Sequence, residues 1–277
     1  MDASAPVDWR PDSSVDRRRA AGPLAFFSDV HGNLPGLQAI LADIGARPGV
    51  EALCLGDLVG YGPHPNDVVG LLHERHIPTL MGNYDRGIGL ETGECGCVYV
   101  TDEQKAEGAA SLAWTTGAVT AATRSRLRSL GGHLLIDTPV GLLLAVHASP
   151  RRLNEYLFED RPETSLRRLV GEAELEMGTP LRAIIFGHTH VPYVRDVPHP
   201  TEDRTVTFVN DGSAGRPRDG DWRACYALID AGFGEPDTLA VSFVRVPYDH
   251  AALQAALAGT SLITTFAGPA GGDRTGA

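Results

Sequence analysis

Five short segments of the chain carry carboxylate, amide or imidazole side chains directly after an apolar run. They are Asp29-Val30-His31, Gly56-Asp57, Gly82-Asn83-Tyr84-Asp85, His147 and Gly187-His188-Thr189-His190. Hard oxygen donors mixed with imidazole nitrogens suit first-row divalent metals such as manganese, iron, zinc or nickel. The candidate ligands, too many for one tetrahedral ion, are Asp29, His31, Asp57, Asn83, His147, His188 and His190. The sequence therefore predicts a pair of ions that share one carboxylate.

Each segment taken alone has a simpler interpretation. Asp29 followed by His31, Gly32 and Asn33 is also typical of a turn with a helix cap. A single histidine after a strand, such as His147, is more often a hydrogen-bonded or surface residue than a ligand. The metal hypothesis is favoured because the pattern recurs at five separate places. A glycine before several of these residues also lets the backbone turn tightly, so that the next side chain can point inward.

The elements that would position these residues alternate in the first part of the chain. We expect strands at residues 24–28, 52–55 and 77–81, separated by helices at 34–46 and 66–76. Such repetition is typical of parallel strands joined by right-handed crossovers. Ligands of an open α/β sheet bind beyond the carboxyl ends of its strands, which is where the candidate side chains lie.

The second part of the chain predicts mostly strands. Residues 101–130 are helical with a break near Gly117, and a hairpin follows at 133–137 and 141–146. After a helix at 163–177 we expect strands at 182–186, 193–197, 204–209, 224–230 and 239–246, then a short helix at 250–257. This pattern predicts two sheets packed face to face, with helices outside. We expect one domain over residues 23–264, a mobile leader over 1–22 and a mobile tail over 265–277.

Composition excludes several classes of protein. A formal net charge of −11 at pH 7 argues against a general binder of nucleic acid or membrane surfaces, which needs a basic surface. No apolar run reaches the length of a membrane span, and the amino-terminal segment lacks the apolar core of a signal peptide, so we expect a cytoplasmic protein. Cys54, Cys95, Cys97 and Cys225 are too few for a disulfide scaffold. We expect reduced structural thiols; the alternatives are a bridge to Cys225 or redox regulation.

The segments read DVHGN, GDLVGYGP, GNYD, VHASP and GHTH, in this order. This series closely resembles the motifs of the calcineurin-like metallophosphoesterase superfamily, and the resemblance spans about residues 24–246. Residues 210–217 resemble the N-x-G-S-x-G-x-P turn of its small bacterial and archaeal phosphodiesterase branch. The resemblance implies an α/β fold, a four-layer αββα sandwich of two mixed β-sheets flanked by helices.

The resemblance also implies a dinuclear centre and the role of each ligand. Asp29, His31 and His190 would hold the first ion, Asp57 would bridge, and Asn83, His147 and His188 would complete the second site. A metal-activated water would attack phosphorus. We expect two divalent transition-metal ions, manganese first, with iron, zinc or nickel as alternatives.

Two positions depart from the family pattern. Many relatives have a histidine where this chain has Tyr84, and the protein phosphatases have an acidic residue, where this chain has Gly60, that orients it. A general acid contributes about 10²–10⁴-fold when a poor leaving group needs a proton, so their joint absence favours phosphodiesters over serine or threonine phosphates. Tyr84 could point away, contact the substrate or donate a proton. His64 is an alternative proton donor, but we favour the interpretation that it is a solvated histidine of a loop.

Arginines near the motifs provide candidates for phosphate binding. Arg86 directly follows GNYD, where it could reach a phosphate or pair with an acid. Arg216 and Arg218 are expected in a solvated turn, with a substrate-rim role as the alternative. Residues 154–158 could form a lid or dock their own loop. The candidate catalytic residues are Asp57, Asn83, Tyr84 and Arg86.

These observations predict a dinuclear-metal phosphoesterase, most simply a phosphodiesterase. Its partner would be a small or nucleotide-like phosphorylated substrate, with no specific nucleic acid and no membrane. One alternative is a phosphomonoesterase or protein phosphatase with the same metal centre. Another is a non-catalytic scaffold that uses the same fold as a binding surface. The sequence carries no indication of oligomeric state.

Overall fold

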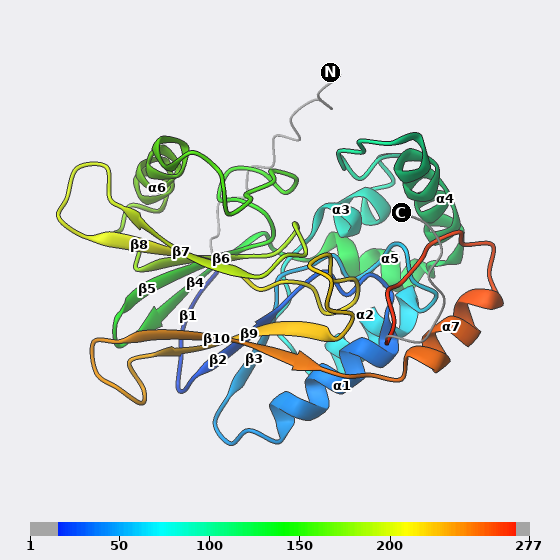
Figure 1. Cartoon of the computed structure of the whole chain (residues 1–277), viewed down its shortest axis with the longest axis horizontal. Coiled ribbons are helices and arrows are strands. Elements are labelled where there is room, and N and C mark those ends of the chain that lie inside the picture. Colours follow the sequence, from blue (N-terminus) through cyan, green and yellow to red (C-terminus); the bar gives the residue numbers. More distant parts are fainter. Residues whose placement is uncertain (1–15, 270–277) are drawn as a thin grey trace.

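Two β-sheets pack face to face in the computed structural model, which describes residues 16–269 (Figure 1). The larger sheet contains, in spatial order, β1 (Asp16–Arg19), β4 (His133–Thr138), β5 (Gly141–Val146), β6 (Ala183–Phe186), β8 (Thr205–Asn210) and β7 (Tyr193–Pro198). The smaller sheet contains β10 (Leu239–Val246), β9 (Ala224–Ala231), β2 (Leu24–Phe27) and β3 (Glu51–Cys54). Both sheets mix parallel and antiparallel pairs.

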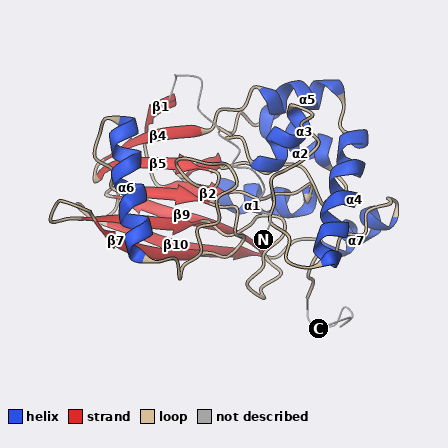
Figure 2. Cartoon of the chain, turned by 90° about the horizontal axis from the view of Figure 1, so that it is seen from above, coloured by secondary structure: helices blue, strands red, loops and turns tan. Residues whose placement is uncertain are grey.

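The helices cover the outer faces of the sheets and one end of the molecule. They are α1 (Leu34–Gly45), α2 (Pro65–Glu74), α3 (Asn83–Gly89), α4 (Asp102–Ala118), α5 (Ala121–Arg128), α6 (Glu163–Met177) and α7 (His250–Ala258). Helix α6 lies over the larger sheet and α1 lies under the smaller one, whereas α2 to α5 and α7 gather at one end (Figures 1 and 2). Within residues 16–269, no helix has the length and apolar character needed to cross a bilayer.

Alternation of side chains along the strands produces these layers. In β2, Leu24 and Phe26 point into the core between the two sheets, whereas Ala25 and Phe27 point into the core beneath the helices. Successive side chains of a strand point to opposite faces, so a strand buried on both faces must be apolar throughout. Strand β5 alternates in the same way between the inter-sheet core and the core under α6. The predicted αββα sandwich is confirmed.

The carboxyl ends of the parallel strands meet at one end of the molecule. Strands β5, β6 and β8 are parallel neighbours in the larger sheet, and β2 and β3 are parallel neighbours in the smaller one. Strands β2, β3, β5 and β6 are each followed by one of the polar segments, and β8 is followed by Asp211. The fold therefore brings together residues from Asp29 to Asp211 that are far apart along the chain.

The structure differs from the expected ends of the domain. Strand β1 pairs in parallel with β4, although residues 1–22 were expected to form a mobile leader. Arg17 donates from Nε and Nη2 to the two carboxylate oxygens of Asp137, at 2.9 and 2.7 Å, and this fork holds the strand at the edge of the sheet. Phe266, in the expected tail 265–277, is buried in the core beneath the helices. Residues 1–15 and 270–277 lie outside the described part of the chain.

Two further local expectations need correction. Residues 77–81 do not form a regular strand; Thr79 and Leu80 make only isolated bridges, to Cys54 and Gly131. The GNYD segment, for which no helix was predicted, begins helix α3. Its first turn is stabilised because the carboxylate of Asp85 accepts a hydrogen bond from the N–H of Gly82, at 3.0 Å.

Candidate metal centre

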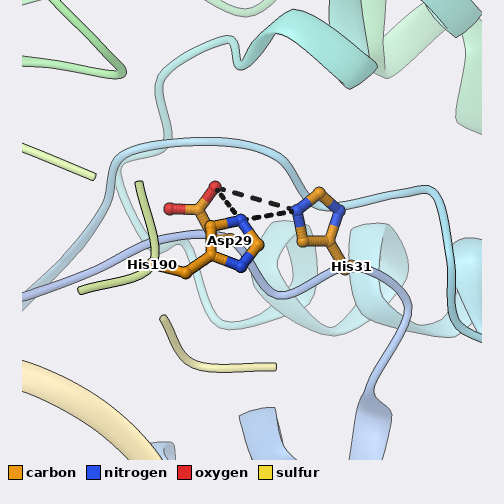
Figure 3. Close-up of side chains that lie close together, drawn as sticks. All are labelled: Asp29, His31 and His190. Atoms are coloured by element: carbon orange, nitrogen blue, oxygen red, sulfur yellow. Dashed lines mark hydrogen bonds and ion pairs between the residues drawn. The ribbon is translucent and has the colours of Figure 1, made fainter. Parts of the chain in front are cut away.

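Two groups of three buried side chains lie where the strand ends meet. Within each group the potential ligand atoms are all within 4.8 Å of one another; the groups are Asp29, His31 and His190, and Asp57, His147 and His188. Figure 3 shows the first group converging on a common point. There, Nε2 of His190 lies 3.2 Å from Oδ1 of Asp29 and 3.2 Å from Nε2 of His31.

Asp57 connects the two groups through one oxygen atom. Its Oδ2 lies 3.7 Å from Nε2 of His31 and 3.5 Å from Nε2 of His147. Its Oδ1 accepts a hydrogen bond of 2.8 Å from the backbone N–H of Tyr84, which fixes the carboxylate. Asn83 joins the second group because its Oδ1 lies 3.0 Å from Nε2 of His147. The structure thus brings together all seven predicted ligands, with Asp57 between the groups.

Backbone carbonyls determine which ring nitrogen faces the centre. The Nδ1 atoms of His31, His147 and His190 lie 3.0, 3.0 and 2.6 Å from backbone oxygens of Val59, Leu55 and Arg216. A carbonyl can only accept, so each Nδ1 carries the hydrogen. Burial lowers the pKa of His31 and of His147, and both are therefore neutral at pH 7. Their Nε2 atoms consequently present lone pairs to the centre, as metal ligands do.

Several buried acceptor atoms face one another without a donor between them. Oδ2 of Asp29 accepts from the hydroxyl of Ser28 at 2.5 Å and from the N–H of His188 at 2.8 Å, whereas its Oδ1 is buried and has no hydrogen-bond partner. The same is true of Nε2 of His188. An unsatisfied buried polar atom costs about 1–3 kcal/mol, and here one orphaned atom belongs to each ligand group. A cation in each group satisfies them.

The charge of the site leads to the same conclusion. Burial raises the pKa of Asp57 well above its ordinary value, and the nearby carboxylates of Asp29 and Asp85 raise it further. Divalent ions bound here would lower this pKa again, because their charge stabilises the ionised carboxylates. The donor set of carboxylates, an amide and imidazoles fits two divalent ions of the first transition row.

Five of the seven ligands lie on strained backbone. Their φ angles are positive, at 52° for Asp29, 46° for His31, 53° for Asp57, 65° for His188 and 62° for His190. Residues with a Cβ rarely adopt this left-handed region, and each such residue costs about 1–3 kcal/mol. Hydrogen bonds between the turns hold two of them in place, since the N–H groups of Asp29 and His31 donate to the carbonyls of Gly56 and Asp57, both at 2.9 Å.

Tyr84 and Gly60, the two departures from the family pattern, fit each other sterically. The Tyr84 side chain is fully buried, with its ring edge-on to His31 at a centroid distance of 5.4 Å. A Cβ on Gly60, whose φ is +91°, would lie 2.4 Å from Cδ1 of that ring. The tyrosine therefore requires a residue without a side chain at position 60. Burial raises the pKa of Tyr84 well above its ordinary value, so the phenol stays protonated.

A hollow of about 450 Å³, including space open to solvent, lies over the ligands. Besides ligands and Tyr84 it is lined by Tyr61, Cys97, Val98, Tyr99, Gln104, Glu107, Tyr156 and Arg218. Arg86 is not among the residues that line it, and its catalytic role stays a prediction. His64 does not line it either; this histidine lies 3.5 Å from Asp67 at the start of α2.

Sequence reasoning missed the contribution of α4 to this hollow. Gln104 and Glu107 belong to α4, which carries none of the motifs, so only the packing of that helix brings them to the site. Glu107 pairs with Arg216, whose guanidinium carbon lies 4.4 Å from the centre of the Tyr61 ring. Tyr156 comes from the segment expected as a lid or a docking anchor, and its ring lies 4.2 Å from that of His188.

Solved structures with similar folds include metallophosphoesterases. The chain is 29% identical to a metallophosphoesterase from Sphaerobacter thermophilus, with 86% of this chain and 94% of that one covered and a TM-score of 0.62. A hypothetical protein from Pyrococcus horikoshii shares the fold, with 23% identity, coverage of 87% and 94%, and a TM-score of 0.68.

Sequence comparison agrees with the geometry. An uncharacterised protein of Methanocaldococcus jannaschii is 31% identical over 241 residues, which cover 82% of this chain and 88% of the relative. The family model described as the calcineurin-like phosphoesterase superfamily domain matches residues 23–232, most of the described chain and every predicted ligand. The chain therefore belongs to the calcineurin-like phosphoesterase superfamily.

Proposed function

We propose that this protein is a phosphodiesterase that hydrolyses small or nucleotide-like phosphodiesters with two divalent ions, manganese first. The observation that carries the proposal is the position of Asp57, whose Oδ2 faces His31 of one group and His147 of the other. A shared carboxylate between two ligand groups is the arrangement of two-metal sites that act on phosphate esters. Family membership supports the same class of reaction.

The protein's own residues would hold and orient the reacting groups. Divalent ions bound here would supply a water of lowered pKa and would neutralise charge on the phosphate. Asp57 would set the spacing of the two sites, because the N–H of Tyr84 fixes its other oxygen. The carbonyls that accept from the Nδ1 atoms of His31, His147 and His190 would keep the imidazoles turned toward the centre.

The choice of a diester rests on Tyr84 and Gly60. The place where relatives have a histidine holds a buried aromatic ring, and the place of its acidic partner has no side chain. A leaving group that needs a proton would find no histidine donor here. Substrates with more acidic leaving groups are therefore favoured. The partly exposed ring of Tyr156 at the hollow supports a nucleotide-like substrate, because bases stack on aromatic rings.

A pair of model esters tests the proposal. With manganese present, we expect kcat/KM for bis(p-nitrophenyl) phosphate to exceed that for p-nitrophenyl phosphate. The variant Asp57→Asn should lose at least about 100-fold in kcat, the scale measured when one electrostatic group is removed from an active site. Preference for the monoester would instead favour the phosphomonoesterase alternative. Manganese binding without turnover of either ester would favour the scaffold, and full activity of Asp57→Asn would sink the bridging assignment.

The location and the partners of the protein remain predictions from its sequence. We propose a cytoplasmic location, a small phosphorylated molecule as partner, and no specific nucleic acid or membrane. The acidic net charge of −11 supports compact anionic substrates over long polynucleotides, which bind best to basic surfaces.

A further inference from the structure

Two thiols lie almost in bonding contact beside the second group of ligands. Cys95 and Cys97 are in the segment between α3 and α4, and their Sγ atoms are 2.8 Å apart. All four cysteines of the chain are free thiols in the structure. Gly96, between the pair, has a φ of +68°, a conformation that glycine adopts without strain and that turns both thiols to the same side. Formation of an S–S bond of about 2.05 Å needs a movement of only about 0.8 Å.

Small oxidants can reach this pair from two sides. Cys97 is partly exposed and lines the hollow over the ligands. Both cysteines also line a second hollow, of about 480 Å³ including open space, which Tyr99 and Lys105 help to form. Cys54 and Cys225 are buried and are not among the residues that line either hollow.

The thiol pair holds Asn83, a ligand of the second group. The Nδ2 of Asn83 donates to the carbonyl oxygen of Cys95 at 2.9 Å and to Sγ of Cys97 at 3.3 Å. An amide is planar, so these two contacts determine where the opposite atom points. That atom, Oδ1, lies 3.0 Å from Nε2 of His147 and faces the centre.

We propose that Cys95 and Cys97 form a reversible disulfide that weakens the second metal site through Asn83. This inference rests on the metal centre of the proposed function. The oxidant is a low-molecular-weight disulfide. One cysteine thiolate attacks it and expels one small thiol, and the other cysteine then attacks the mixed disulfide and expels the second. The two cysteines are oxidised, the small disulfide is reduced to two thiols, and the thiol protons end on those products.

The bond changes both acceptors of Asn83. Sγ of Cys97 must turn toward Cys95, and the closed ring restrains the peptide that carries the Cys95 carbonyl. The amide then loses the contacts that aim Oδ1. Groups that orient a metal ligand typically contribute 10–100-fold to metal affinity, so we expect the dissociation constant of the second manganese to rise about 10–100-fold on oxidation. The site of Asp29, His31 and His190 does not contact the pair and should keep its affinity.

The test uses the full chain and needs no turnover. The metal-free protein is treated with oxidised glutathione or with dithiothreitol, and its intact mass and a peptide map report the thiols. Manganese is then titrated calorimetrically into both forms. In the mass measurement we expect the peptide with Cys95 and Cys97 to lose two hydrogen atoms. In the titration we expect the second manganese to bind more weakly and the first to bind as before. Dithiothreitol should reverse both changes.

Matched variants separate this pair from a general effect of oxidation. The double variant Cys95→Ser/Cys97→Ser has neither thiol and should bind manganese identically before and after glutathione, whereas Cys225→Ser should respond as the wild type does. In each single variant the remaining cysteine can form only the mixed disulfide, which the intact mass reports separately. Absence of the disulfide in the wild-type mass, or a disulfide that leaves manganese binding unchanged, would overturn the proposal. Two manganese ions bound without hydrolysis of any ester would count against the proposed function alone, since neither mass nor titration depends on activity.

Discussion

Arg218 is the exposed cation that reaches the hollow from the segment after β8. It lines the hollow, and its backbone N–H donates to the carbonyl of the ligand His190 at 3.1 Å. This bond anchors the arginine beside the centre, while its guanidinium remains exposed. A guanidinium presents a planar fork of donors that matches the oxygens of a phosphate. Arg218 is therefore better placed than Arg86 to bind the substrate.

We expect Arg218→Ala to lower kcat/KM for the model diester about 10- to 100-fold. Hydrogen bonds to charged groups contribute about 1.5–3 kcal/mol, and each 1.4 kcal/mol is tenfold. Arg223→Ala is the matched control, because Arg223 is exposed in the same segment and is bonded to Asp221 at 2.6 Å. Steady-state kinetics should give this control a kcat/KM within about twofold of the wild-type value, because an exposed ion pair contributes little. Equal losses in both variants would remove Arg218 from substrate binding.

The candidate ligands could be predicted at this scale, whereas the choice between Arg86 and Arg218 could not. Asp57 and His188 each follow a buried strand and a glycine, a local pattern that is visible in the sequence. Arg86 and Arg218 both adjoin a motif, and the choice between them depends on how α3 is rotated against the sheet. That rotation follows from tertiary packing, which the local sequence does not encode.

At the scale of elements, the turn after β3 and the first turn of α3 form one steric unit. The carboxylate of Asp85 accepts from the N–H groups of Gly82 and Leu58, at 3.0 and 2.9 Å, and so ties the two segments together. Burial raises the pKa of Asp85 to about 6, against the effect of these hydrogen bonds. Within this unit the ring of Tyr84 fills the space beside Gly60.

We expect Gly60→Ala to reduce the free energy of unfolding by about 2–6 kcal/mol. A positive φ costs a residue with a Cβ about 1–3 kcal/mol, and overpacking a core adds about 1–3 kcal/mol. When Tyr84→Leu is added to Gly60→Ala, the protein should recover only the part of the free energy of unfolding that overpacking removed. Gly70→Ala in α2 is the control: a Cβ there meets nothing within 4 Å, and we expect no loss of stability. Urea unfolding measures these variants together with the wild type and the single variant Tyr84→Leu. Strictly additive effects of the two substitutions would show that Gly60 and Tyr84 are not coupled.

Long periodic elements were predictable, whereas short ones were not. Helices α1 and α6 bury apolar residues at helical spacing, such as Leu37 and Ile40 in α1, and they occur close to where they were expected. Strand β1 is a run of arginines after Asp16, with no apolar alternation, and only its pairing with β4 makes it a strand. Helix α3 is short and starts from a glycine, so its stability comes from tertiary contacts.

At the scale of the whole molecule, the centre joins the two sheets. Asp29 and Asp57 follow strands of the smaller sheet, whereas His147, His188 and His190 follow strands of the larger one. A bound ion is therefore held by ligands from both layers of the sandwich. Since the unfolded chain cannot offer this arrangement, metal binding should stabilise the folded state as a whole.

Removal of metal should accordingly lower the melting temperature. Manganese at 100 times its dissociation constant adds about 2.7 kcal/mol for one site, and each kcal/mol shifts the Tm of a protein of this size by about 2–4 °C. We expect Tm to fall by at least about 5 °C when EDTA replaces manganese, as measured by calorimetry. Asp57→Asn should show a smaller shift. An equal Tm with manganese and with EDTA would contradict a metal centre shared by the two sheets.

The left-handed backbone at five ligands makes this site easy to lose in evolution. Strain of about 1–3 kcal/mol at each position is, in sum, comparable with the whole stability of a typical domain, about 5–15 kcal/mol. A descendant that no longer needed an ion would gain stability from glycine or asparagine at Asp29 or His188, so drift there would be favoured rather than neutral. All five positions carry candidate metal ligands in this chain.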